Sequence, residues 1–98
     1  MLIILSKRTQ RRLVNLLEYL ENEWSVKTKH DFVKKLDKSL HQIQKHPESC
    51  PKSDKIKGLY KCIVTHQITI FYRIKADEIE IVTLFDTRQD PGKLRKEN

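Results

Sequence analysis

Three strand-like runs fill the last third of the chain, and they constrain the fold more than any other feature. Branched and aromatic residues are dense in segments 58–64, 68–74 and 79–91. The gaps between these segments are only a few residues long. Gaps this short join antiparallel neighbours, because a parallel connection needs a crossover of about a dozen residues or more. The sequence therefore predicts a three-stranded antiparallel meander.

Two helical segments precede these runs. Ser6 suits the N-cap of the first, and Pro47 ends the second near His46, because proline disfavours helical backbone in the residue before it. The second helix is expected to begin near Ser25. Apolar residues recur at helical spacing in both segments, as Leu13, Leu16, Leu17, Leu20 and Trp24, and as Phe32, Val33, Leu36, Leu40 and Ile43. Each segment is thus expected to bury one face.

These elements predict one α+β domain over residues 1–98. Its order is a short N-terminal strand at residues 2–5, a two-helix hairpin, and the three-stranded antiparallel meander. Residues 47–57 form the one irregular loop. The helices are expected on one face of a single sheet, which leaves the other face for a partner.

The strand register decides which side chains share a face. We assume a two-residue turn at His66–Gln67 and a slightly longer one at Lys75–Glu78. Arg73 then lies opposite Glu80, and Lys61 lies on the opposite face from Arg73 unless a bulge intervenes. The face toward the helices collects Ile63, Ile68, Ile70, Tyr72, Ile74, Ile79, Ile81 and Phe85. The other face collects Tyr60, Cys62, Val64, Thr69, Phe71, Arg73, Glu80, Val82, Leu84 and Asp86.

Positive charge is clustered along the chain. Lys and Arg number 20 against 13 Asp and Glu, which gives a net charge of +7. The cationic clusters lie at the start, between residues 52 and 75, and at the end. Arg8, Arg11 and Arg12 fall in the first turns of a helix, where its dipole disfavours cations. Such a field favours a polyanion or an acidic protein partner, and the alternative is a well-solvated surface.

Several function classes are disfavoured by the sequence. No apolar run approaches the roughly 18 residues of a membrane span, and residues 1–5 are too short for a leader, so a cytoplasmic protein without membrane contact is expected. Cys50 and Cys62 lack a metal-binding spacing and are expected to be free thiols. The four histidines are scattered, and no glycine-rich phosphate loop is present. We expect neither a metal nor a cofactor.

The order of these segments resembles the RelE/ParE superfamily of toxins from bacterial type II toxin–antitoxin systems. The order and spacing of the segments carry the resemblance over nearly the whole chain. The matching segments are the basic start 5–12, the helical stretch 16–24, the loop 47–51, Leu59-Tyr60-Lys61, Phe71-Tyr72-Arg73, and Asp86-Thr87-Arg88-Gln89-Asp90-Pro91. The resemblance implies a compact toxin that associates with a cognate acidic antitoxin in a hetero-oligomer.

The superfamily contains two mechanisms. Members similar to RelE cut messenger RNA on the ribosome without a metal, whereas members similar to ParE bind and block DNA gyrase. For cleavage, the resemblance implies Lys61, Arg73 and Arg88 as catalytic residues. Yet Thr69 stands where cleaving members tend to carry arginine, and the last ten residues contain neither Tyr nor His. The resemblance therefore favours a ParE-like toxin, with a ribonuclease and an inactive interaction module as alternatives.

The residues expected to bind the target or the antitoxin are all basic. They are Arg8, Arg11, Arg12, Lys61, Arg73 and Arg88.

Overall fold

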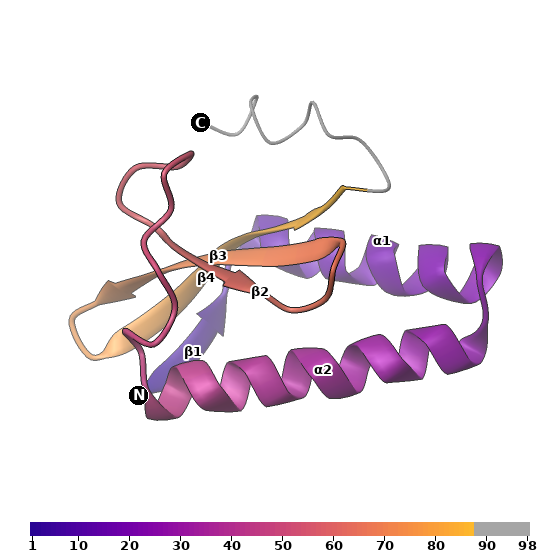
Figure 1. Ribbon diagram of the computed structural model, residues 1–98, viewed down its shortest axis with the longest axis horizontal. Coiled ribbons are helices and arrows are strands. Elements are labelled where there is room, and N and C mark those ends of the chain that lie inside the picture. The colour runs from indigo at the N-terminus through magenta and orange to yellow at the C-terminus, as the bar shows by residue number, and fades with distance from the viewer. Residues whose placement is uncertain (88–98) are drawn as a thin grey trace.

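Residues 1–87, which the computed structural model describes, form two helices and one four-stranded sheet (Figure 1). The elements in chain order are β1 (Leu2–Leu5), α1 (Lys7–Glu23), α2 (Val26–Lys45), β2 (Tyr60–Ile63), β3 (Ile68–Lys75) and β4 (Glu78–Asp86). The predicted α+β order, the helical hairpin and the antiparallel meander are confirmed. The strand order is β1-β4-β3-β2, in which β1 pairs parallel with β4. The sequence did not indicate where β1 would join the sheet.

Serine side chains cap both helices. The cap at Ser6 and a helix start near Ser25 were predicted, whereas the cap at Ser25 was not. Ser6 Oγ accepts the Thr9 backbone N–H at 3.0 Å, and Ser25 Oγ accepts the Thr28 N–H at 3.0 Å. Each bond satisfies one of the donors that a helix N-terminus leaves without an intrahelical partner. Helix α2 ends at Lys45, two residues before Pro47.

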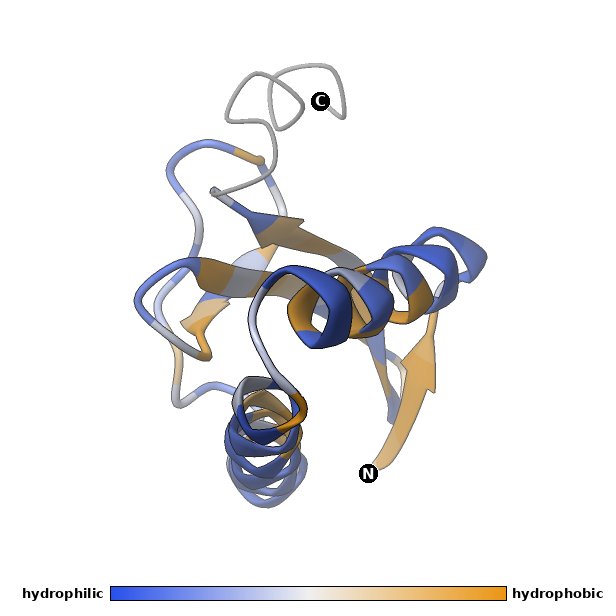
Figure 2. Cartoon of the chain, turned by 90° about the vertical axis from the view of Figure 1, so that its right-hand side faces the viewer, coloured by the Kyte–Doolittle hydropathy of each residue, from blue (hydrophilic) through white to orange (hydrophobic). Residues whose placement is uncertain are grey.

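The main core lies between the helices and one face of the sheet. Both helices turn their apolar stripes toward it and their polar residues outward (Figure 2). Its most buried members are Leu16, Leu20, Phe32, Ile43, Ile68, Ile70, Tyr72, Ile79 and Ile81. The prediction that Trp24 and Val33 lie in the core was wrong, because Trp24 is 57 % exposed and Val33 is 42 % exposed. Trp24 caps the end of α1, and Val33 lies at the edge of the apolar stripe of α2.

The predicted register of β2 was wrong by one residue. Cys62 pairs with Ile70 and Ile63 with Thr69, because the connection between β2 and β3 is longer than the assumed two-residue turn. Val64 N–H and Thr65 N–H both donate to Ile68 O, at 2.9 and 3.1 Å. A one-residue slip moves every side chain of a strand to the other face. Cys62 is therefore buried toward the helices, and Ile63 is 64 % exposed.

A bulge in β4 overturns a second part of the predicted faces. Tyr72 pairs with Ile81 but Phe71 pairs with Thr83, which leaves Val82 as the extra residue. The predicted pair of Arg73 with Glu80 lies before the bulge and is confirmed. Beyond it the faces exchange: Leu84 packs in the main core, whereas Phe85 packs with Phe71 on the opposite face.

We call the sheet face turned away from the helices the outer face. Phe71 and Phe85 are buried on it beneath Leu59 and Ile56, which belong to the loop between α2 and β2. This loop leaves the end of α2 and returns to β2 on the far side of the sheet (Figure 1). The outer face is therefore partly covered and is not wholly open as predicted.

Candidate functional site

The basic start of α1 is seated on the edge of β4. Strand β1 pairs with β4 only as far as Ile81, so β4 runs on without a strand partner on that side. Side chains of α1 instead donate hydrogen bonds to the carbonyl groups of β4. Thr9 Oγ1 donates to Ile81 O at 2.9 Å, and Arg12 Nη1 donates to Leu84 O at 3.2 Å. Ser6 Oγ donates to the carbonyl of Val82, the bulge residue, at 2.8 Å. The helix start thus closes a sheet edge.

The three predicted arginines of α1 are not equivalent. Arg8 and Arg11 are exposed, whereas Arg12 is half-buried and bonded to β4. Burial, and secondarily the charge of Arg8, lowers the pKa of Arg12. Arg12 therefore has a structural role that the sequence did not reveal. The one signal in the sequence is that Ser6 and Thr9, which precede it, are residue types whose side chains often bond to backbone groups. The binding roles of all three arginines remain predictions.

Lys61 and Arg73 lie on the same face of the sheet, contrary to the predicted register. Lys61 pairs with Phe71, so both side chains point to the outer face, and Arg73 follows two residues later on β3. Diagonal neighbours of this kind are about 7–8 Å apart, within reach of long side chains. The slip in β2 therefore brings together two predicted site residues. The third cation expected near them, Arg88, lies outside the described residues.

An ion pair already engages Arg73. Its Nε donates to Glu80 Oε1 at 2.6 Å, and about half of the Arg73 side chain is exposed. The carboxylate neutralises the guanidinium locally, but its bond uses one of the five N–H donors of arginine. Lys61 is half-buried beside this pair. Together these residues can hold an anionic group, which is the chemistry that their positions support.

The described residues bring no complete metal or acid–base site to these cations. Residues 1–87 contain no cluster of three or more His, Cys, Asp or Glu side chains that could hold a metal ion. Metal-free RNA cleavage would also need a general acid and a general base within hydrogen-bond reach. Glu80 is bonded to Arg73, and His66 is exposed in the connection between β2 and β3, as the sequence predicted.

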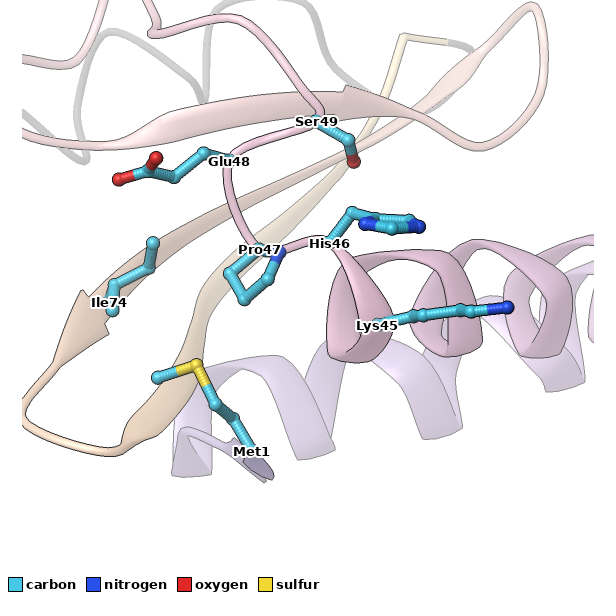
Figure 3. A pocket seen from close by; sticks show the side chains of 7 residues that line it. All are labelled: Met1, Lys45, His46, Pro47, Glu48, Ser49 and Ile74. Atoms are coloured by element: carbon cyan, nitrogen blue, oxygen red, sulfur yellow. The ribbon is translucent and has the colours of Figure 1, made fainter.

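A shallow pocket of 410 Å³ lies at the end of α2, near the N-terminus. Figure 3 shows Met1, Pro47 and Ile74 gathered on one side of it, with Lys45 and Glu48 extending in opposite directions. Ile74 points to the opposite face of β3 from its neighbour Arg73. The pocket is therefore separate from the cations of the outer face. The residues that line it are Met1, Lys45, His46, Pro47, Glu48, Ser49 and Ile74.

Solved structures of bacterial toxins share this fold. A structure described as the chromosomal ParDE toxin–antitoxin system from P. aeruginosa matches with a TM-score of 0.74 and 12% identity, over 88% of this chain and 95% of that chain. The YoeB dimer from Staphylococcus aureus matches with a TM-score of 0.60 and 20% identity, over 87% and 94%. The YoeB/ParE toxin from Agrobacterium tumefaciens matches with a TM-score of 0.62 and 14% identity, over 88% and 98%. At these identities the likeness is one of fold.

The family follows from the sequence match. The family of the ParE toxin of type II toxin–antitoxin systems, parDE, matches residues 3–91. The chain belongs to this family and is a toxin of the RelE/ParE superfamily, as the resemblance indicated. No curated protein matches the chain significantly. Neither helix in the described part is long and apolar enough to cross a membrane.

Proposed function

We propose that this protein is a ParE-like toxin that arrests growth by binding an essential cytoplasmic enzyme, with DNA gyrase as the target. The match to the ParE family over residues 3–91 carries the proposal. The outer face agrees with binding rather than catalysis, because the Arg73 guanidinium is paired with Glu80. A target of this kind would be inhibited by contact with the toxin and would need no bond-breaking step.

The proposed antidote is an acidic antitoxin. With a net charge of +7, the toxin would attract a negatively charged segment at long range and speed its association. The structure from P. aeruginosa is described as a ParDE toxin–antitoxin system, which supports a hetero-oligomer here as well. Arg8 and Arg11 are the exposed cations of α1 that we assign to such contacts.

One observation favours a second candidate, a ribosome-dependent mRNA endoribonuclease. Lys61 and Arg73 share the outer face, where two cations can stabilise a phosphoryl transition state. Some similar structures are YoeB toxins. In this reading Glu80 would release Arg73 when RNA binds, and Arg88 would complete the site. An inactive interaction module is the third reading, and arrested growth on induction would remove it.

Induced expression with parallel labelling of DNA and protein synthesis separates the candidates. For the ParE-like toxin we expect DNA synthesis to fall first, and purified toxin to inhibit supercoiling by gyrase at micromolar concentration. An early fall in protein synthesis, with gyrase unaffected, would contradict the proposal and favour the ribonuclease. Lys61→Ala and the exposed-lysine control Lys75→Ala complete the design. Under the ribonuclease reading only Lys61→Ala would abolish cleavage of mRNA on stalled ribosomes.

A further inference from the structure

The loop before β2 adds a short stretch of antiparallel pairing to the edge of the sheet. Lys52 forms a bridge with Tyr60, Ser53 N–H donates to Leu59 O at 2.7 Å, and Lys61 N–H donates to Pro51 O at 2.8 Å. In an antiparallel ladder the residue numbers of paired positions have a constant sum. Continued by two residues along each segment, the register of this bridge sets Cys50 opposite Cys62 on the same face.

This position favours a covalent link. The bonds on either side of Lys52 and Tyr60 make them a non-hydrogen-bonded pair, and the pair two residues along has the same character. Side chains approach most closely in such pairs, with Cβ atoms about 4.5–5.5 Å apart. A disulfide needs a Cβ separation of about 3.5–4.5 Å, so the link requires the two Cβ atoms to move only slightly closer than in an ordinary pair of this kind.

The two thiols are in contact in the folded chain. Cys50 packs against the core cluster that contains Cys62, and the two side chains are close enough that Cys50 contributes to the raised pKa of Cys62. Both are free thiols, and they are the only cysteines in the sequence. Cys50 is half-buried and is reached by small solutes, whereas Cys62 is only 8 % exposed. One thiol is therefore accessible, and the other is held beside it.

We propose that Cys50 and Cys62 are a redox modification site, at which a peroxide converts the thiol pair into a reversible intramolecular disulfide. In the first step the Cys50 thiolate attacks hydrogen peroxide, which gives a sulfenic acid at Cys50 and releases hydroxide. In the second step the Cys62 thiolate attacks the Cys50 sulfur and expels hydroxide. Two thiols lose two protons and two electrons, and the peroxide is reduced to two molecules of water.

The environment of Cys62 sets the rate of the second step. Burial, together with the neighbouring Cys50, raises the pKa of Cys62 to about 12. Only a small fraction is thiolate near neutrality, so disulfide formation is slow there. Its rate rises roughly tenfold per pH unit, because the thiolate is the nucleophile. Conversion of Cys50 to an uncharged sulfenic acid removes one source of this shift.

The disulfide would hold the loop against the sheet. It closes a ring from residue 50 to residue 62, which contains Leu59 over the outer face and Lys61 within β2. A cross-link of this loop length raises stability mainly by restricting the unfolded chain. The expected result is an upward shift of the melting temperature by at least about 5 °C. The surface around Lys61 would become more rigid.

The test is mass spectrometry of the folded, purified full chain after treatment with hydrogen peroxide at pH 7 and pH 9. We expect a monomeric product that has lost two hydrogen atoms, forms faster at pH 9, melts higher and reverts with dithiothreitol. Cys62→Ser should instead accumulate a sulfenic acid at Cys50 that dimedone traps. Cys50→Ser should remain largely unmodified.

Other products would overturn the proposal. These are disulfide-linked dimers alone, or over-oxidation of wild-type Cys50 to sulfinic acid without an internal disulfide. A chain that forms the disulfide only when unfolded in urea would also contradict it, because the folded geometry would then not favour the link. Circular dichroism before and after treatment shows that each product is still folded.

Discussion

Tyr72 shows how one residue joins three parts of the chain. Its side chain is buried in the main core, and its ring stacks on Tyr60 with the centroids 5.2 Å apart. Its hydroxyl donates to Pro47 O at 2.7 Å. Strand β3 is thereby tied both to β2 and to the loop that follows α2. A buried tyrosine usually finds such a partner, because an unpaired hydroxyl in the core is costly.

Tyr72→Phe should therefore lower the free energy of unfolding. The substitution keeps the ring but leaves Pro47 O without this donor, and the expected loss is about 1–2 kcal/mol in urea denaturation. Tyr60→Phe is the matched control. The ring of Tyr60 belongs to the same stack but is only half-buried, so a loss below about 0.5 kcal/mol is expected. Equal losses in the two variants would contradict the role assigned to the Pro47 bond.

Stability should also fall as the pH rises above about 9. Burial is the largest cause that raises the pKa of Tyr72, and it raises that of Cys62 from 9.0 to about 12. The folded state then holds protons that the unfolded chain loses. Below pH 9 both groups are protonated in the folded and the unfolded chain, so their contribution to the free energy of unfolding is fully present. As the pH rises above 9 this contribution is lost, by at most about 1.4 kcal/mol per pH unit for each group.

Urea denaturation between pH 8 and pH 10.5, with a reductant to keep the thiols free, measures this slope. Cys62→Ser should flatten the first part of the decline and Tyr72→Phe the later part. A wild-type stability that is independent of pH over this range would contradict the buried positions of both groups.

At the scale of the elements, the start of α1 is held by hydrogen bonds to β4. Its first turn carries no acidic residue, so no carboxylate there stabilises the helix by interacting with the helix dipole. It begins where it does because Ser6 caps it and also bonds the bulge carbonyl, and because Thr9 and Arg12 bond β4 further along. The bulge and the helix start therefore stabilise each other.

Replacement of the two N-cap serines should distinguish local from tertiary capping. Ser6→Ala removes both the cap and the bond to Val82 O, with an expected loss of about 2 kcal/mol. Ser25→Ala removes an exposed cap and should cost about 1 kcal/mol or less. Thermal or urea unfolding of both variants makes the comparison. A larger loss for Ser25→Ala would mean that the contact of α1 with β4 contributes little.

At the scale of the whole molecule, the basic side chains lie on more than one surface, one of which is the partly covered outer face. The main core is shared by both helices and the sheet, so the residues proposed to bind a partner lie on its periphery. Lys61 and Arg73 gather on the outer face, and Arg8 and Arg11 lie on the exposed side of α1. The cations are therefore spread over more than one side of the protein.

Association with an acidic antitoxin should accordingly depend on salt through its rate. Between roughly 50 and 500 mM salt the association rate constant should fall at least tenfold, because screening shortens the reach of the charge. Arg8→Ala together with Arg11→Ala should reduce this dependence without a measurable loss of stability. Lys34→Ala with Lys38→Ala, on the exposed side of α2, is the matched control. An association rate that does not change with salt would contradict electrostatic steering.

Much of the architecture is set by local sequence signals. Ser6 and Ser25 start the helices, Pro47 limits the second, and the dense apolar runs become strands, because capping, proline geometry and side-chain periodicity act over a few residues. The pair of Arg73 with Glu80 was predictable for the same reason, since the tight connection between β3 and β4 is local. The toxin family was likewise indicated by the order of the segments alone.

The shared face of Lys61 and Arg73 was decided by the tertiary structure. It depends on the length of the connection between β2 and β3, and the bulge at Val82 similarly exchanges Leu84 and Phe85 between faces. Neither feature carries a strong signal in the sequence. The same residues fit more than one strand register, and the packing of the whole sheet decides which register forms. The same is true of the contact between Cys50 and Cys62 and of the bond from Arg12 to β4. These features join segments that are distant in the chain or depend on an exact register, and only the folded core brings them together.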